Sequence, residues 1–142
     1  MGDKFNIIQF LKSAVATGAS DEHLKVGHPP FIRKNGFIKK TNMAPLSKEE
    51  LDSAILEIAP TAIRDEILTL CDVDFMYEIK GCSRFRINYN RQLGMPALVI
   101  RNISYTIPQL KDLSLPEILN SIVEYQNGIV LVTGPTGSGK ST

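Results

Sequence analysis

The sequence has no apolar run that approaches the length of a membrane-spanning helix, so we expect no direct insertion into a membrane. Its net charge is only +1, which gives no indication of nucleic-acid or membrane-surface binding through bulk electrostatics. It has only two cysteines, Cys71 and Cys82, which form no C-x-x-C motif. They predict two reduced thiols in a cytoplasmic protein, while a disulfide between them stays open at this level.

The N-terminus lacks the features of a secretory signal peptide. Asn6, Gln9 and Lys12 interrupt its apolar residues, and no small-residue cleavage site follows. It also lacks the Ser or Thr that a myristoylation motif requires at position 6. A chain of 142 residues is long enough to bury an independent core. We therefore expect a soluble intracellular protein.

The first forty residues predict a helix, a short strand and a hairpin. Apolar residues at helical spacing run from residue 5 to 15 and share one face of a helix that Gly18 would end: Phe5, Ile8, Leu11 and Val15. Residues 19–27 read as a strand. His23 within it predicts a half-buried histidine rather than a metal ligand, because no second ligand lies nearby at metal spacing. Asn35-Gly36 predicts a tight hairpin turn between 31–33 and 37–39.

Two helices are expected next. Ser47 and Glu50 form a capping box before a helix whose core face would carry Leu51, Ala54, Ile55 and Ile58. Pro60 would end this helix and begin another, with Ile63, Ile67 and Leu70 on one side. The prediction is that these consecutive helices cover one face of a sheet.

Residues 72–90 alternate apolar and polar side chains, which predicts a second hairpin. Its register follows from matching the apolar faces: Tyr77 opposite Phe85, Phe75 opposite Ile87, and Ile79 opposite Ser83, with residues 80–82 as the loop. On the polar face, Glu78 then lies opposite Arg84, and Met76 lies opposite Arg86. Arg84 therefore has a directly opposed acid, whereas Arg86 has only the diagonal Asp74 and Glu78.

The strand predicted at 97–103 carries Arg101 inside an otherwise apolar run, and such an arginine needs an anion or a carboxylate. Residues 104–116 contain two prolines and few periodic apolar residues, which predicts an interdomain linker. Beyond it, residues 115–122 have the apolar spacing of a helix. The β-branched run 129–133 predicts a strand buried in a parallel sheet.

The chain ends in the pattern G-x-x-x-x-G-K-[ST] of a phosphate-binding Walker A loop: Gly134, Pro135, Thr136, Gly137, Ser138, Gly139, Lys140, Ser141 and Thr142. Its glycines let successive N–H groups converge on a polyphosphate, Lys140 would reach the β- and γ-phosphates, and Ser141 would ligate Mg²⁺. ATP and Mg²⁺ are thus the expected cofactors. A flexible Gly/Ser-rich tail is the alternative, and ATP binding by this chain alone is a separate question, because the helix that completes such a site would follow Thr142.

Taken in order, several short motifs resemble one family. They are Ala19-Ser20-Asp21 with His23-Leu24, Ile32-Arg33 with Gly36, Asp74-Phe75, Arg84-Phe85-Arg86-Ile87-Asn88, and the loop 134–142. The chain is similar to the N-terminal part of the type IV pilus retraction (twitching motility, PilT-type) ATPases of the type II/IV secretion ATPase superfamily. It departs from the family at Glu22, where an apolar residue is usual, and at 93–96, where a glycine-rich stretch is usual.

The resemblance implies an α+β fold: a PAS-like N-terminal domain over 1–103, a linker over 104–116, and over 117–142 the first helix, strand and P-loop of a truncated RecA-like ATPase domain. It also implies that Arg86 and Arg101 act as arginine fingers on the nucleotide phosphates. With Lys140 they are the expected catalytic residues. The chain by itself is expected to be inactive, because the catalytic carboxylate and the Mg²⁺-ligating acid belong to the missing part of that sheet.

The family further implies a cytoplasmic homo-hexamer, peripheral to the inner membrane at the pilus base, that hydrolyses ATP at subunit interfaces and works with an inner-membrane platform protein, without nucleic acid. The short segment before Ala19 favours retraction over a pilus extension or type II secretion ATPase, which usually carries a further domain there. An alternative of another class is a non-catalytic PAS-like structural or sensing module in which Arg86 forms a plain surface ion pair.

Overall fold

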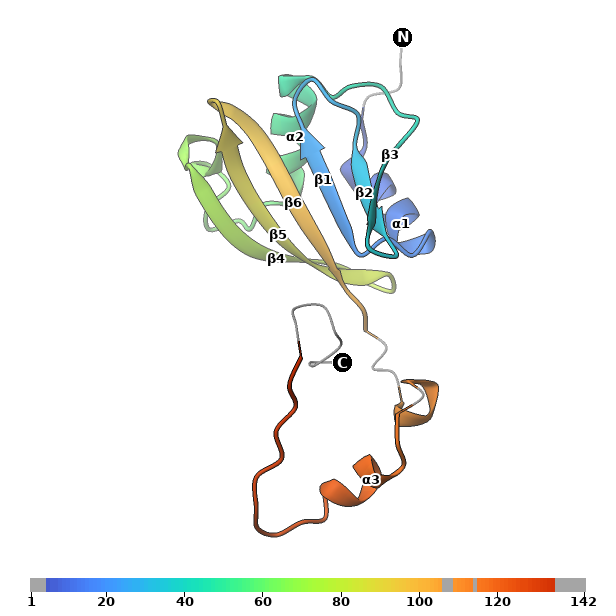
Figure 1. Cartoon of the computed structure of the whole chain (residues 1–142). Coiled ribbons are helices and arrows are strands. Elements are labelled where there is room, and N and C mark those ends of the chain that lie inside the picture. The colour runs from blue at the N-terminus through green and yellow to red at the C-terminus, as the bar shows by residue number, and fades with distance from the viewer. Residues whose placement is uncertain (1–4, 106–108, 114, 135–142) are drawn as a thin grey trace. The chain divides into compact units, whose positions relative to one another are not determined.

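The computed structural model describes residues 5–105, 109–113 and 115–134. The chain divides into two compact units, Met1–Ser104 and Tyr105–Thr142, and each is considered by itself. The first unit is an antiparallel sheet of six strands in the order β3-β2-β1-β6-β5-β4, with two α-helices packed on one face (Figure 1). Its elements are α1 (Ile7–Ala16), β1 (Asp21–Lys25), β2 (Phe31–Lys34), β3 (Phe37–Lys40), α2 (Lys48–Ile58), the 3₁₀ turn η1 (Ile67–Thr69), β4 (Asp72–Ile79), β5 (Ser83–Gln92) and β6 (Met95–Ile103).

Helix α1 begins where the Asn6 side chain accepts a hydrogen bond from the backbone N–H of Gln9 at 2.8 Å. It ends before Gly18, whose φ of 77° an L-residue rarely adopts. The expected apolar stripe is only partly right, because Phe5, Ile8 and Val15 are half-buried. The fully buried residues of the helix are Ile7, Phe10, Leu11 and Ala14. The buried face of α1 is therefore rotated about the helix axis relative to the predicted stripe. Such a rotation is possible because the residues next to that stripe are also apolar or small.

Helix α2 confirms the predicted capping box, with the Ser47 side chain accepting from the Glu50 N–H and the Glu50 side chain accepting from the Ser47 N–H. All four predicted core residues of this helix are buried: Leu51, Ala54, Ile55 and Ile58.

The second predicted helix, after Pro60, is wrong. Its residues form successive i→i+3 turns and the single 3₁₀ turn η1, and only Ile67 is fully buried there. The Arg64 guanidinium donates to the Ala59 carbonyl at 2.9 Å, which satisfies the end of α2 and favours a turn over a new helix. The sheet is therefore covered by α1 and α2.

Both predicted hairpins are present. In β2–β3, Lys34 pairs with Phe37 around Asn35-Gly36, whose φ angles of 51° and 81° are those of a tight turn. In β4–β5 the register agrees with the prediction at every expected pair: Phe75 with Ile87, Met76 with Arg86, Tyr77 with Phe85, Glu78 with Arg84, and Ile79 with Ser83. The matching of apolar faces thus fixed this register without help from the rest of the sheet.

Strand β6 joins the two hairpins, because it pairs with β5 on one side and with β1 on the other. Along each strand, alternate residues face the helices or the open side of the sheet. The helix-covered face holds the apolar core, whose largest fully buried side chains include Tyr89, Phe85, Ile87, Leu98 and Ile100. The open face carries charged residues, and these define the site described below.

Glu22 is an acidic side chain that is fully buried on the helix-covered face. The Asn102 side-chain N–H group donates to Glu22 Oε1 at 2.8 Å and to the Ala19 carbonyl at 2.6 Å. Within the described residues, Glu22 Oε2 and Asn102 Oδ1 have no hydrogen-bond partner. Burial raises the pKa of Glu22 to about 7, against the opposing hydrogen bond from Asn102. This carboxyl group is therefore largely protonated below neutral pH.

The second unit contains a 3₁₀ turn, η2 (Leu110–Leu113), and a short helix, α3 (Ile118–Ile122), with no buried residue. The strand expected at 129–133 is a wrong prediction for this chain. Those residues form no regular structure, and Ile129 and Leu131 are 85% and 79% exposed. A parallel strand forms only against neighbouring strands, and among the described residues of this unit there are none.

The α+β fold class is confirmed for the first unit, as an antiparallel sheet with helices on one face. Its PAS-like designation and the domain limits stay predictions. The phosphate-binding loop lies outside the described residues, apart from Gly134. Over the described ranges, the chain has no helix that is both long and apolar enough to span a membrane.

We predict that Glu22 makes the stability of the first unit depend on pH. Its pKa is raised from 4.5 to about 7 on folding, so the folded protein binds more protons than the unfolded one. The stabilisation is complete below about pH 4.5 and is lost as the pH rises through about 7. The contribution of this group to the free energy of unfolding should fall by about 3 kcal/mol over that interval, as measured by urea denaturation at each pH.

The variant Glu22→Gln keeps the shape of the side chain and removes the titration, so its stability should not fall over the same interval. Glu49→Gln, which removes an exposed acid on α2, is the matched control and should keep the wild-type profile. An unchanged pH profile in Glu22→Gln would contradict the prediction.

Candidate functional site

A row of side chains crosses the open face of the sheet from β4 to β2. Met76 on β4 pairs with Arg86 on β5, Arg86 pairs with Arg101 on β6, Arg101 pairs with Asp21 on β1, and Asp21 pairs with Arg33 on β2. The two arginines that sequence reasoning selected therefore lie directly opposite each other on neighbouring strands. Like charges in such a pair repel, so this arrangement requires negative charge close by.

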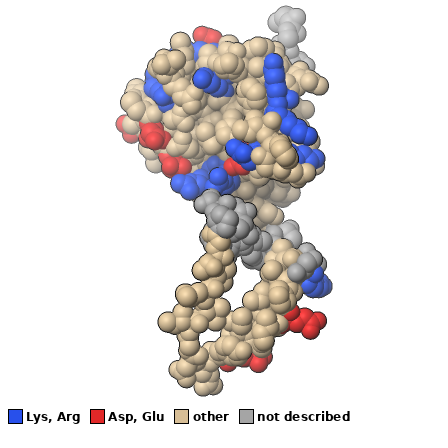
Figure 2. Space-filling model, in the orientation of Figure 1, with Lys and Arg blue, Asp and Glu red and all other residues tan. Residues whose placement is uncertain are grey.

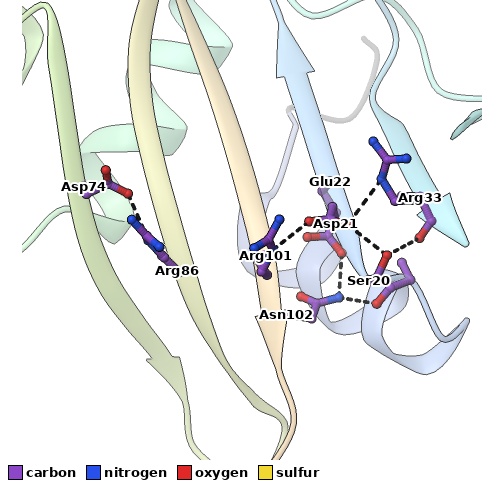
Figure 3. Close-up of polar contacts among 9 residues, drawn as sticks. Ser20, Asp21, Glu22, Arg33, Asp74, Arg86, Arg101 and Asn102 are labelled. Atoms are coloured by element: carbon purple, nitrogen blue, oxygen red, sulfur yellow. Dashed lines mark hydrogen bonds and ion pairs between the residues drawn. The ribbon is translucent and has the colours of Figure 1, made fainter. Parts of the chain in front are cut away.

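Two carboxylates supply that negative charge, one on the outer side of each arginine (Figure 3). Arg86 Nε lies 3.2 Å from Asp74 Oδ1, and Arg101 Nε lies 3.0 Å from Asp21 Oδ1. The expectation that Arg101 needs a carboxylate is confirmed, and so is the expected diagonal contact between Asp74 and Arg86. The order across the sheet is acid, arginine, arginine, acid.

The two arginines remain accessible despite these contacts. Their side chains are 60% exposed for Arg86 and 68% exposed for Arg101. In both, the contact uses Nε, and within the described residues neither guanidinium forms another hydrogen bond. The terminal nitrogens of both side chains are therefore available to an anion. Arginine suits this role, because its planar fork presents several donors to a phosphate or carboxylate group.

A cavity of about 320 Å³ lies on this face of the sheet. It is lined by Asp21, Asp74, Arg86, Asn88, Val99 and Arg101. Asn88 donates to Asp72 at 2.6 Å and to Asp74 at 3.5 Å, so hydrogen bonds order the β4–β5 side of the cavity. The cavity is thus a polar hollow with two exposed guanidinium groups.

Asp21 differs from Asp74 in its surroundings. Its side chain is only 12% exposed, and it contacts Arg33 at 3.4 Å and Ser20 Oγ at 2.9 Å in addition to Arg101. Burial alone would raise the pKa of Asp21, but hydrogen bonds from Arg101 and Ser20 and the charges of Arg101 and Arg33 lower it overall. Asp21 is therefore charged at neutral pH.

His23, Cys71 and Cys82 lie outside the lining of this cavity. Burial, followed by the charge of Arg33, lowers the pKa of His23, in keeping with the predicted half-buried histidine. Over the part of the chain that the structure describes, His, Cys, Asp and Glu do not gather into a metal-binding group, and Cys71 and Cys82 are free thiols. Figure 2 shows both signs of charge in several separate groups over the visible face of the first unit.

Of the residues expected to form the site, the structure brings Arg86 and Arg101 together. Lys140, Ser141 and the other residues of the loop from 135 to 142 lie outside the described residues. Sequence reasoning missed the part played by Asp21 and Ser20, although both belong to a motif it had noted. The need of Arg101 for a carboxylate indicated that an acidic residue lies beside it. The sequence of neither strand shows that β1 pairs with β6, so Asp21 could not be identified as that residue.

Comparison with known proteins agrees with this fold. No family model matches the chain. It is 36% identical over 138 residues to the type IV pilus retraction ATPase PilT of Pseudomonas aeruginosa, covering 96% of the chain and 40% of PilT. It is 34% identical to a twitching motility protein of Neisseria gonorrhoeae, covering 97% of the chain and 37% of that protein.

The crystal structure of the pilus retraction motor PilT with bound ADP matches with a TM-score of 0.80 at 35% identity, over 97% of the chain. This chain belongs to the PilT-type ATPase family. It spans about 40% of the length of the PilT proteins that it matches.

We predict that neither arginine is needed for folding. Both form ion pairs in which the arginine is exposed, and such pairs typically contribute no more than about 1 kcal/mol. Arg86→Ala and Arg101→Ala should therefore each lower the free energy of unfolding by less than about 1 kcal/mol, as measured by denaturant unfolding of this chain.

Ile87→Ala is the comparison variant, because Ile87 is fully buried one position from Arg86 on the opposite face of β5. It should cost about 2 to 5 kcal/mol. A loss of that size in either arginine variant would show that the arginine holds the sheet together.

Proposed function

We propose that this chain forms the N-terminal part of a hexameric, PilT-type ATPase in which Arg86 and Arg101 act as arginine fingers on the phosphates of ATP. The observation that carries the proposal is the pairing of these two side chains on the open face of the sheet. Each is held through Nε and is mostly exposed, and within the described residues its terminal nitrogens have no hydrogen-bond partner. Two such groups beside one hollow match the charge and donor geometry of a polyphosphate.

The chemistry of phosphoryl transfer supports the same assignment. Its transition state spreads negative charge over the transferred group, so catalysis depends mainly on positioning and on charge neutralisation. An arginine finger contributes roughly 10³ to 10⁵ in rate in enzymes that use one. Arg86 and Arg101 would supply two positive charges at fixed positions on neighbouring strands, where a rigid sheet holds their backbones.

The phosphate cradle of this site would come from the Walker A loop, Gly134 to Thr142. Lys140 would contact the β- and γ-phosphates and Ser141 would ligate Mg²⁺. The bound ADP in the PilT crystal structure supports nucleotide binding in the family. We propose that the arginines and the loop meet at subunit interfaces of a homo-hexamer.

For the role of the whole protein we propose pilus retraction, in keeping with the descriptions of the Pseudomonas and Neisseria relatives. The protein would act in the cytoplasm, peripheral to the inner membrane, and would work with a platform protein at the pilus base. Pilus extension or type II secretion by a related ATPase is the alternative within this class.

A non-catalytic PAS-like module is the alternative from another class, and one observation favours it. Arg86 already has an acidic partner in Asp74, so a surface ion pair explains its presence without a nucleotide. The two proposals predict different rates of ATP hydrolysis when the arginine is removed from the complete protein.

We predict that Arg86→Ala or Arg101→Ala in the full-length ATPase lowers kcat by about 10³-fold or more, because a charge that stabilises the transition state is lost. Steady-state ATP hydrolysis measures this, and the oligomeric state is checked by gel filtration. Arg84→Ala is the control, since Arg84 lies on the same strand and face but outside the cavity lining. Turnover that is unchanged in both cavity variants would favour the module.

We also predict that residues 1–142 alone do not hydrolyse ATP, because the catalytic carboxylate of the ATPase domain is expected beyond them. Release of inorganic phosphate from ATP and Mg²⁺ by the purified chain measures this. Turnover above the level of a Lys140→Ala control would contradict the prediction.

A further inference from the structure

Asp21 is the most enclosed charged group in the row that crosses the open face. We propose that Asp21 is a positioning residue for Arg101, which it holds through Nε so that the terminal nitrogens stay placed for phosphate, while Ser20 and Arg33 hold Asp21 in turn. This inference rests on the proposed function of Arg101 and adds to it a residue that does not touch the nucleotide. It concerns how the guanidinium is kept in place.

The register of the sheet puts one carboxylate between two arginines. Asp21 is the direct partner of Arg101 in the β1–β6 pair and of Arg33 in the β1–β2 pair. Its Oδ1 accepts from Arg101 Nε at 3.0 Å, while its Oδ2 lies 2.9 Å from Ser20 Oγ and 3.4 Å from Arg33 Nε. The two carboxylate oxygens of Asp21 therefore have different roles. Oδ1 holds Arg101, whereas Oδ2 is held by Ser20 and Arg33.

The groups that hold Asp21 are themselves fixed to the sheet. The Ser20 N–H donates to the Arg33 carbonyl at 2.8 Å, and the Ser20 carbonyl accepts from the Asn102 N–H at 3.0 Å. The Arg33 guanidinium also donates to the Gly36 carbonyl in the hairpin turn at 3.2 Å. Side chains locked by such supporting contacts keep a functional group close to its productive geometry. Figure 3 shows this cluster beside Arg101.

The second arginine has weaker support, which gives an internal comparison. Asp74 is 51% exposed, against 12% for Asp21, and the other hydrogen bond to it, from Asn88, is 3.5 Å long. An exposed ion pair holds its side chains in place only weakly. Arg101 is therefore the pre-positioned arginine, and Arg86 has more freedom to adjust to the ligand.

Loss of Asp21 has two effects that act on different kinetic constants. It removes a negative charge beside the cavity, which by itself favours phosphate binding and does not raise KM. It also releases Arg101 Nε, and a displacement of about 1 Å at a catalytic group costs on the order of 10²-fold in rate. A positioning role thus predicts a lower kcat with an unchanged or lower KM, whereas general damage to the site would raise KM.

The test is steady-state ATP hydrolysis by full-length variants, each checked for stability by denaturant unfolding. Asp21→Ala should lower kcat about 10-fold to 100-fold without raising KM. In the Arg101→Ala background, Asp21→Ala should have no further effect, because two residues that act through one group are not additive. Ser20→Ala removes one support of Asp21 and keeps the carboxylate, so it should lower kcat by only a few fold.

Asp65→Ala is the control, because Asp65 is an exposed carboxylate that lies outside the cavity lining. Its kcat should equal the wild-type value. If Arg101→Ala slows hydrolysis while Asp21→Ala does not, the positioning role is wrong and the arginine finger stands. If Asp21→Ala slows hydrolysis equally with and without Arg101, the positioning role is also wrong. If Arg101→Ala is fully active, the proposed function itself fails.

Discussion

The antiparallel pairing of β1 with β6 is the interaction on which the rest of the first unit depends. It joins segments 80 residues apart and makes one sheet of the two hairpins. Without it, β1 to β3 and β4 to β6 would be separate small sheets, and a two- or three-stranded sheet needs a packed face to be stable. The same pairing brings Asp21 beside Arg101, so the fold and the candidate site have one structural origin.

Consecutive residues hold this pair of strands from both faces of the sheet. On the open face the Asp21 carboxylate contacts Arg101, and on the helix-covered face the Glu22 carboxyl accepts from Asn102. The two acids differ in charge state because their surroundings differ. Arginines and a hydroxyl group surround Asp21 and lower its pKa, whereas burial in the apolar core raises the pKa of Glu22. Adjacent acidic residues in one strand thus serve as an ion-pair partner and as a hydrogen-bond acceptor that is largely neutral below pH 7.

The local elements of the first unit were predictable where one short segment carries all the information. The Asn35-Gly36 turn, the Ser47 capping box and the β4–β5 register all follow from side chains within about ten to twenty residues. The helix expected after Pro60 failed because weak helical spacing competed with turns that close the end of α2. The strand expected at 129–133 failed because apolar, β-branched composition indicates a strand only where a sheet is present to receive it.

By itself, the sequence determined the order of motifs that marks the family, the position of both hairpin turns, the β4–β5 register, and the need of Arg101 for an anionic partner. Only the tertiary structure decided that Asp21 is the carboxylate that contacts Arg101, that the two arginines lie directly opposite each other, and that Asp21 is enclosed while Asp74 is exposed. The physical reason is that pairing between distant strands depends on how the helices and hairpins pack together. No local pattern encodes the partner of a residue 80 positions away.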